Sequence, residues 1–149
     1  MPRSAIESLI PHREPFLLLD EIHGDGGDEL TAQFTLDEKL PLFAQIYAGH
    51  YPHNPVTPGV ILCEIIFQAG AALLAGKIAG GGAGGTPVIT RIRDARFKRL
   101  VKPNETLAIH VALTDQAANA FYLDGKITVG GELAVRVSFT CALIESINN

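Results

Sequence analysis

The stretch that decides the fold covers residues 49–68 and reads GHYPHNPVTPGVILCEIIFQ. Its first half is a loop held extended by three prolines, because proline fixes its own φ and biases the residue before it away from helix. These prolines are Pro52, Pro55 and Pro58. From residue 60 to 77 nearly every residue is apolar and no proline interrupts the run, which predicts a buried helix. Pro58 stands just before its first turn, where the missing N–H costs no hydrogen bond.

The loop and the start of this helix carry groups suited to acid–base chemistry. His50 supplies an imidazole, which can act as a base near neutral pH. Glu64 and Gln68 are four residues apart and therefore share one face of the helix, where burial favours the neutral, proton-donating form of the carboxyl. The first helical residues, Gly59 and Val60, present free backbone N–H groups and the positive end of the helix dipole. Together these groups suit a reaction next to a carbonyl.

Composition limits the class of protein. The 149 residues are 47% hydrophobic and 19% charged, which is typical of one globular domain over residues 1–149. The net charge of −4 argues against nucleic acid as a partner. Cys63 and Cys141 are far apart in apolar surroundings, which favours a reduced, cytoplasmic protein. We expect no signal peptide, and no inserted membrane span because Glu64 interrupts the longest apolar run.

The first half of the chain predicts short elements. The sequence indicates a helix, a strand, a turn and a second strand over residues 4–10, 16–22, 24–28 and Glu29–Thr35. Ser4 and Glu7 have capping-box spacing for that first helix. Residues 36–58 are predicted to be mostly loop, with one helical turn at 42–45, and the glycines of 80–85 a flexible linker.

The second half predicts an antiparallel sheet. Apolar residues alternate with polar or small ones over residues 107–113, 121–129 and 133–143, as in strands with one face covered. Gly130 and Gly131 form a hairpin turn between two of these strands. A single apolar helix and several long strands pack best when the sheet wraps the helix. The predicted fold class is therefore α+β, with a long antiparallel sheet around one buried central helix.

The motifs in these segments resemble the β-hydroxyacyl-acyl carrier protein dehydratases of fatty acid synthesis, the FabZ/FabA type. The matching segments are GHYP at 49–52, NP at 54–55, PGV at 58–60, IPHR at 10–13, PFLLLD at 15–20 and ARFKR at 95–99. Glu64 follows His50 by fourteen positions, as the acidic residue follows the histidine in that family. The glutamate at this position, in place of an aspartate, resembles the FabZ-type members of the family and not the FabA-type members. The sequence departs from the family pattern at Glu14, His53 and Thr57, which flank the mouth of the site.

This resemblance implies a hot-dog fold and a (3R)-hydroxyacyl thioester substrate carried on the phosphopantetheine of acyl carrier protein, with no metal or redox cofactor. It implies that His50 takes the α-proton, Glu64 protonates the departing hydroxyl, and the Gly59 amide polarises the thioester carbonyl, with Val60, Pro58 and Gln68 in support. It also implies a homodimer in which His50 faces Glu64 of the partner subunit. Three such dimers can form a hexamer.

Two sets of residues allow other interpretations. His50, His53 and Glu64 could be metal ligands, but no rigid element fixes their spacing as a helical His-Glu-x-x-His motif does. His12 and Arg13 are interpreted as structural residues that hold the N-terminal segment.

Residues 91–102 carry six cations and one carboxylate. This segment is either a solvated strand face or a docking surface for acidic acyl carrier protein. These cations are Arg91, Arg93, Arg96, Lys98, Arg99 and Lys102.

Two other functions remain open beside the dehydratase. A hot-dog acyl thioesterase or enoyl hydratase would use the same pocket for another reaction. A non-catalytic homologue would bind acyl carrier or acyl chains without turnover, and it would not need His50, Gly59 and Glu64 together.

Overall fold

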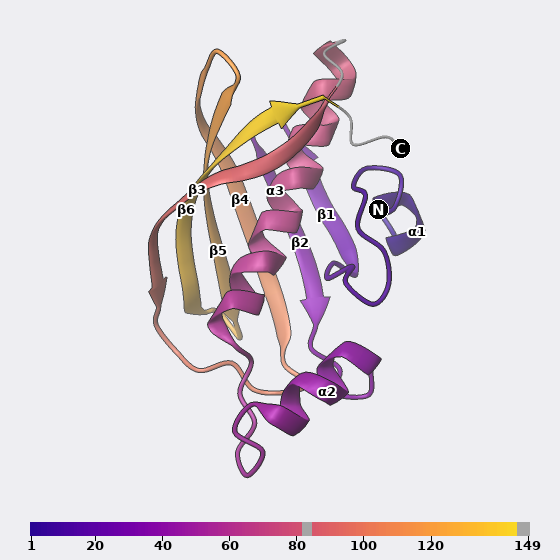
Figure 1. The fold of residues 1–149 in the computed structure, drawn as a ribbon, viewed down its shortest axis with the longest axis vertical. Coiled ribbons are helices and arrows are strands. Elements are labelled where there is room, and N and C mark those ends of the chain that lie inside the picture. The colour runs from indigo at the N-terminus through magenta and orange to yellow at the C-terminus, as the bar shows by residue number, and fades with distance from the viewer. Residues whose placement is uncertain (82–84, 146–149) are drawn as a thin grey trace.

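The computed structural model describes residues 1–81 and 85–145 and contains one long helix against one curved sheet (Figure 1). The helices are α1 (Arg3–Ile6), α2 (Pro41–Gly49) and α3 (Gly59–Gly81). The strands are β1 (Glu21–Gly26), β2 (Glu29–Thr35), β3 (Thr86–Phe97), β4 (Thr106–Ala117), β5 (Ala120–Val129) and β6 (Glu132–Ile144).

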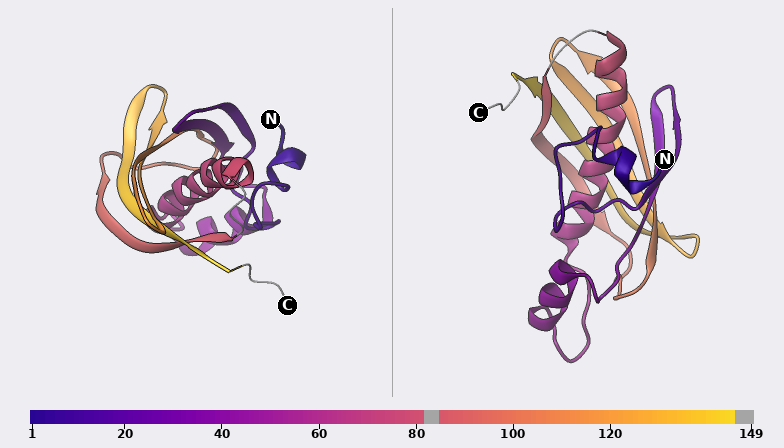
Figure 2. Two further views of the ribbon diagram at one scale, coloured as in Figure 1. Left: turned by 90° about the horizontal axis from the view of Figure 1, so that it is seen from above. Right: turned by 90° about the vertical axis from the view of Figure 1, so that its right-hand side faces the viewer.

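The six strands form one antiparallel sheet in the order β1-β2-β4-β5-β6-β3. Viewed along the helix, the sheet curves around α3 (Figure 2). β1 and β3 are therefore the edges, and β3 leaves one row of backbone groups without a neighbouring strand among the described residues. The predicted fold, an antiparallel sheet around a central helix, is confirmed.

The core lies between α3 and the inner face of the sheet. Alternate residues of β4 and β5 are buried against the helix, as period-two strands with one covered face require. Gly125 allows the closest approach, because a Cβ at this position would lie 2.2 Å from Cγ2 of Ile66 on α3. The Gly130–Gly131 turn has φ of 57° and 82°, values that glycine adopts without strain, which confirms the predicted hairpin.

The N-terminal segment differs from the prediction. α1 is only four residues long, begins after Pro2, and has no side-chain cap, so the Ser4–Glu7 capping box is wrong. β1 begins at Glu21, so the strand predicted over residues 16–22 is also wrong for most of its length. Residues 16–19 lie outside the sheet because their backbone groups bond to side chains, including those of Arg3 and Gln68, instead of to a strand.

The ends of three further elements differ from the prediction. β1 continues to Gly26, so the turn predicted over residues 24–28 shrinks to Gly27 and Asp28. The single turn predicted at 42–45 is instead the nine-residue helix α2, which begins with Pro41 at N1. The central helix begins at Gly59 and extends past Lys77, and part of the predicted glycine linker lies outside the described residues.

By length and composition alone, α3 could cross a membrane over Gly59–Ile78, although Glu64 interrupts its apolar run. In the fold, however, this helix is the element that the sheet encloses, and its Ile65, Ile66 and Ala69 are fully buried. Its hydrophobicity is explained by the protein core.

Candidate active site

His50 directly follows α2 and is held by contacts at both its backbone and its ring. Its N–H donates to the carbonyl of Ile46 at 2.8 Å, and its Nδ1 lies 2.8 Å from the carbonyl oxygen of Val56. A carbonyl can only accept, so Nδ1 carries the hydrogen and Nε2 carries the lone pair. Tyr51, at φ 55°, packs edge-on against the ring with centroids 4.7 Å apart. The imidazole is thus fixed in the tautomer that a base acting through Nε2 requires.

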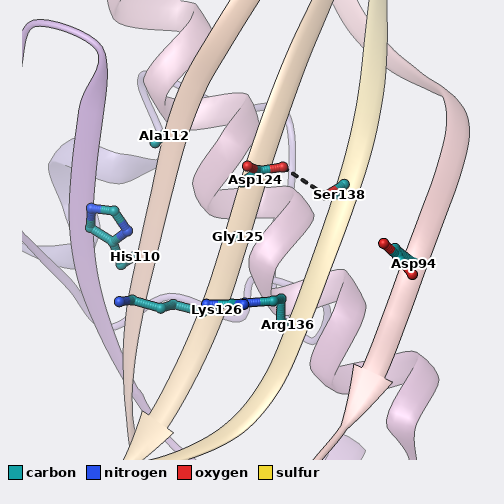
Figure 3. Close-up of a pocket in the computed structure, with 8 residues that line it drawn as sticks. All are labelled: Asp94, His110, Ala112, Asp124, Gly125, Lys126, Arg136 and Ser138. Atoms are coloured by element: carbon teal, nitrogen blue, oxygen red, sulfur yellow. Dashed lines mark hydrogen bonds between the residues drawn. The ribbon is translucent and has the colours of Figure 1, made fainter.

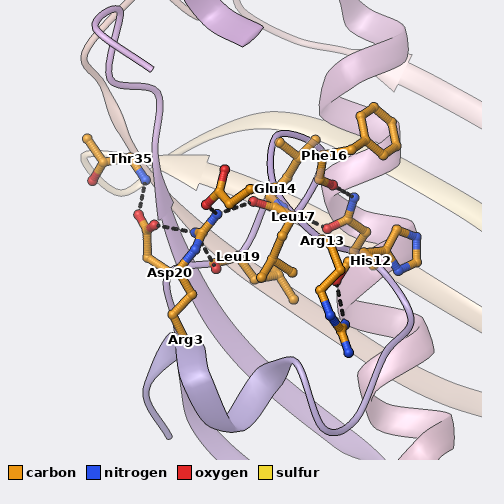
Figure 4. A network of polar contacts seen from close by, with 11 residues as sticks. Arg3, His12, Arg13, Glu14, Phe16, Leu17, Leu19, Asp20 and Thr35 are labelled. Atoms are coloured by element: carbon orange, nitrogen blue, oxygen red, sulfur yellow. Dashed lines mark hydrogen bonds and ion pairs between the residues drawn. The ribbon is translucent and has the colours of Figure 1, made fainter. Parts of the chain in front are cut away.

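Glu64 lies on the second turn of α3, and Gln68 holds its carboxylate. The Nε2 of Gln68 donates to Oε1 of Glu64 at 3.2 Å. The side chain of Glu64 is 26% exposed, whereas Gln68 is fully buried. The same amide donates to the carbonyl of Phe16 and accepts from the N–H of Leu18, both at 2.8 Å. Gln68 therefore joins the carboxylate, the helix and the N-terminal segment in one network. Figure 4 shows the N-terminal segment at this point, with His12, Phe16 and Leu17 labelled.

His12 lies beside Glu64, a contact that the sequence did not predict. Its Nε2 lies 3.6 Å from Oε1 of Glu64, and its buried Nδ1 has no hydrogen-bond partner among the described residues. The sequence indicates a structural residue, and the structure places its ring beside the predicted acid. The fold of the N-terminal segment decides this contact, and the only signal in the sequence is the Pro-His-Arg motif at 11–13.

A small cavity of about 210 Å³ adjoins Glu64. It is lined by His12, Glu64, Phe67, Ala71, Pro87, Val88, Ile89 and Cys141. Burial raises the pKa of the Cys141 thiol to about 11, so this group stays protonated at neutral pH. Apart from His12 and Glu64, the lining is apolar or neutral, which suits an acyl chain.

The start of α3 presents two amides. The carbonyl of Pro58 accepts from the N–H groups of Ile61 and Leu62. Within the described residues, the N–H groups of Gly59 and Val60 have no acceptor, as is usual for the first turn of a helix. Val60 is 76% exposed, and a Cβ at Gly59 would lie 2.7 Å from the ring of Phe97. The ring of Phe97 therefore packs against Gly59 in the space that a side chain there would need, whereas the neighbouring Val60 is exposed.

His50 and Glu64 of one chain have separate partners. His50 contacts Val56 and Tyr51, whereas Glu64 contacts His12 and Gln68. Thr57, one of the departures from the family pattern, is buried and bonds through its hydroxyl to Tyr47 at 2.7 Å, while His53 is exposed. In residues 1–81 and 85–145, no group of three or more His, Cys, Asp or Glu side chains is placed to hold a metal ion.

The basic segment lies along β3 and the loop after it. Arg91, Lys98 and Lys102 are exposed. Arg99 instead makes two hydrogen bonds to Glu105, at 2.9 and 3.1 Å, and an ion pair with Glu132. That arginine lowers the pKa of the Glu105 carboxyl, as expected for a bidentate pair. Arg93 lies over the ring of Tyr122, and Arg96 contacts Asp94.

With the site in view, comparison with known proteins identifies the family. The model of the ApeI-like family, described as ApeI dehydratase, matches residues 23–132. This chain belongs to the ApeI-like dehydratase family. The resemblance to dehydratases seen in the sequence motifs is thereby confirmed.

Curated relatives match this ApeI-like chain over nearly its full length. The 3-hydroxyacyl-[acyl-carrier-protein] dehydratase FabZ of Rickettsia massiliae is 36% identical over 135 residues, 90% of each protein. The FabZ of Rickettsia felis is 36% identical over 141 residues, 93% of this chain and 92% of the relative.

Solved structures share the fold of the ApeI-like chain. A chain of the dehydratase heterocomplex ApeI:P from Xenorhabdus doucetiae superposes with a TM-score of 0.80 at 16% identity, covering 98% of this chain and 93% of that one. A hypothetical thioesterase from Streptococcus pneumoniae, solved with coenzyme A, superposes with a TM-score of 0.62 at 15% identity, covering 86% and 90%.

Proposed function

We propose that this protein dehydrates (3R)-hydroxyacyl-[acyl carrier protein] to trans-2-enoyl-[acyl carrier protein] in fatty acid or related polyketide biosynthesis in the cytoplasm. The observation that carries the proposal is 36% identity to FabZ over 90% of both chains, combined with His50, Gly59 and Glu64 at the positions of the family motifs. The enzyme is a hydro-lyase that uses no cofactor of its own, since the substrate brings its own phosphopantetheine.

His50 is the base. With Nδ1 held by the carbonyl of Val56, the lone pair of Nε2 takes the proton from the α-carbon of the thioester. A positioned general base contributes roughly 10²–10⁴ in rate. The carbonyl of Val56 also stabilises the imidazolium that forms, because the bond from Nδ1–H strengthens when the ring becomes charged.

Glu64 is the acid. As the bond from the β-carbon to the hydroxyl breaks, the protonated carboxyl of Glu64 gives its proton to the leaving oxygen and water departs. The amide of Gln68, 3.2 Å from Oε1, orients the carboxyl and stabilises the carboxylate that remains. His50 then releases its proton to solvent and Glu64 takes up a proton from solvent, which restores both groups before the next turnover.

The amides of Gly59 and Val60 bind the thioester carbonyl, where negative charge develops as the α-proton leaves. One such donor contributes roughly 10²–10³ in rate. Pro58 helps to keep this position at the N-terminus of α3, because it cannot donate to the preceding turn.

The site is shared between two protomers. Its support is the separation of contacts within one chain, since His50 and Glu64 have no partner in common in the part of the chain that the structure describes. β3 is an edge strand and exposes Ile89, Ile92 and Phe97, so pairing with β3 of a second copy would extend the sheet and cover these residues. His50 then faces Glu64 of the partner subunit, and three dimers can assemble into a hexamer.

Acyl carrier protein docks on the basic segment. Arg91 on the edge strand β3, and Lys98 and Lys102 after it, are exposed cations. Arg99 is held by two glutamates and contributes less. Replacing Arg91 and Lys98 by glutamate should raise KM for carrier-bound substrate and leave KM for a short thiol thioester unchanged. An equal rise for both substrates would contradict docking at this segment.

The test of the function is a spectrophotometric assay with 3-hydroxybutyryl and crotonyl thioesters. We expect the conjugated enone band to rise with the first substrate and fall with the second. His50→Ala and Glu64→Gln should each reduce kcat by about 10²–10⁴, while His23→Ala, an exposed histidine on β1, should leave it unchanged. Release of free thiol would indicate a thioesterase instead, and no reaction with any chain length would indicate a binding protein.

A further inference from the structure

The outer face of the sheet, turned away from α3, carries a row of cations that the proposed dehydration does not use. Arg136 on β6 is the register partner of both Arg96 on β3 and Lys126 on β5, and Lys126 is in turn the partner of His110 on β4. We call the three charged residues among them, Arg96, Arg136 and Lys126, the cation row, and His110 lies beside it on β4. Figure 3 shows the Arg136 and Lys126 side chains lying across the strands, with Lys126 directed toward His110.

Such a row is unfavourable without a counterion. Neighbouring strands are about 4.8 Å apart, and like charges directly opposite each other destabilise a sheet. The ion pairs among the described residues include neither Arg136 nor Lys126. An anion placed along the row therefore removes a repulsion as well as forming new bonds.

A bulge in β3 adds Arg96 to the row. Arg93 pairs with Ser138 and Arg96 with Arg136, so three steps along β3 match two along β6. Regular pairing would place Ala95 opposite Arg136 and turn Arg96 to the other face of the sheet. The bulge contains Asp94 at φ 56°, a conformation that is rare for a residue other than glycine. Bulges of this kind re-aim side chains, often next to functional sites.

The row borders a hollow of the size that small ligands need. It measures about 490 Å³, within the range of roughly 300–1,000 Å³ for small-molecule sites. Its lining consists of Asp94, His110, Ala112, Asp124, Gly125, Lys126, Arg136 and Ser138 (Figure 3). An adjoining hollow shares three of these residues and adds Arg96 and Lys98.

The charges of the two hollows favour an anion that also carries donors. The linings of the two hollows together contain four cations, Arg96, Lys98, Lys126 and Arg136, and two carboxylates, Asp94 and Asp124, in a protein whose net charge is −4. Asp94 contacts Arg96, and His110 lies 3.5 Å from Glu29. Asp124 accepts from the hydroxyl of Ser138 at 2.7 Å and has further acceptor capacity.

We propose that this face binds a phosphorylated small molecule. Arg136 and Lys126 bind successive phosphate groups of a diphosphate, the arginine through two parallel N–H bonds and the lysine as a point charge. Asp124 and Ser138 accept from hydroxyl groups of the same ligand. The site lies on the opposite side of the sheet from Glu64, and it does not depend on the dehydratase assignment.

The experiment is calorimetric titration of the purified protein with inorganic pyrophosphate, at matched ionic strength against sodium chloride. We expect one binding event per chain and a rise in Tm with pyrophosphate. Arg136→Gln and Lys126→Gln should each weaken binding by about tenfold or more. Lys39→Gln, an exposed cation before α2, should bind as the unaltered protein does, and all three variants should retain crotonyl thioester hydration.

The absence of pyrophosphate binding, or equal binding by all the variants, would overturn the proposal. The same holds if Arg136→Gln and Lys126→Gln weaken binding of acyl carrier protein while pyrophosphate does not bind, because the row would then be a protein-docking surface.

Discussion

Among single residues, Gln68 has the widest structural role. It is fully buried, and both atoms of its amide are used, by Leu18 on one side and by Phe16 and Glu64 on the other. A buried amide is stable only when its bonds are made. The contacts of Gln68 thus fix the N-terminal segment on α3, which in turn places His12 beside Glu64.

Replacing Gln68 by leucine tests this role. The change leaves the N–H of Leu18 and the carbonyl of Phe16 without partners in the interior, which should lower the free energy of unfolding by about 2–4 kcal/mol. It should also lower kcat, since Glu64 loses its orienting donor. Urea denaturation measures the first effect and the thioester assay the second.

The control is Gln45→Leu on α2, where the side chain is exposed, and this change should alter stability by less than about 0.5 kcal/mol. Equal stability of the two variants would show that the network around Gln68 does not hold the segment.

Among the elements, α3 and β5 fit together most closely. Gly125 leaves no room for a side chain, because its Cβ would lie 2.2 Å from Cγ2 of Ile66. Gly125 lies on a strand that is paired with β4 and β6, and Ile66 lies in the helix α3. Neither residue can therefore move away from the other without strain.

Gly125→Ala should therefore destabilise the protein by about 1–3 kcal/mol through overpacking. The matched control is Gly26→Ala in β1, where an added Cβ meets nothing within 4 Å. Combining Gly125→Ala with Ile66→Ala should cost less than the sum of the two single changes. Simple additivity in thermal denaturation would contradict the close contact.

At this scale, the sequence predicted the elements that hydrophobic periodicity determines. The long apolar run gave α3, and alternation gave the strands β4, β5 and β6. Residues 16–19 form a short apolar run as well, and Leu17, Leu18 and Leu19 are buried. Their backbone partners are side chains far along the sequence, so periodicity could not distinguish them from a strand.

The residues of the candidate site likewise include some that the sequence predicted and some that it could not predict. His50, Gly59 and Glu64 lie within one short stretch, and their spacing could be compared with a family pattern. His12 is distant in sequence, and its contact with Glu64 depends on how the N-terminal segment folds over α3. The cation row depends on strand register and on the bulge at Asp94, neither of which residue types alone specify.

For the whole molecule, the central claim is that one reaction site is built from two chains. The edge strand β3 with its exposed apolar residues, and the separate surroundings of His50 and Glu64 in one chain, both support it. We therefore predict that a protomer alone, although it has both His50 and Glu64, does not bring them to the same substrate.

Mixing His50→Ala with Glu64→Gln protein, under conditions that exchange subunits, tests this claim most directly. Each variant alone should have kcat lowered by about 10²–10⁴. Half of the randomly formed dimers are mixed, however, and each mixed dimer has one site with both groups intact. We predict recovery of about one quarter of the unaltered protein's activity, measured with the 3-hydroxybutyryl thioester. Mixed dimers that are demonstrably formed yet remain inactive would contradict a site shared between protomers.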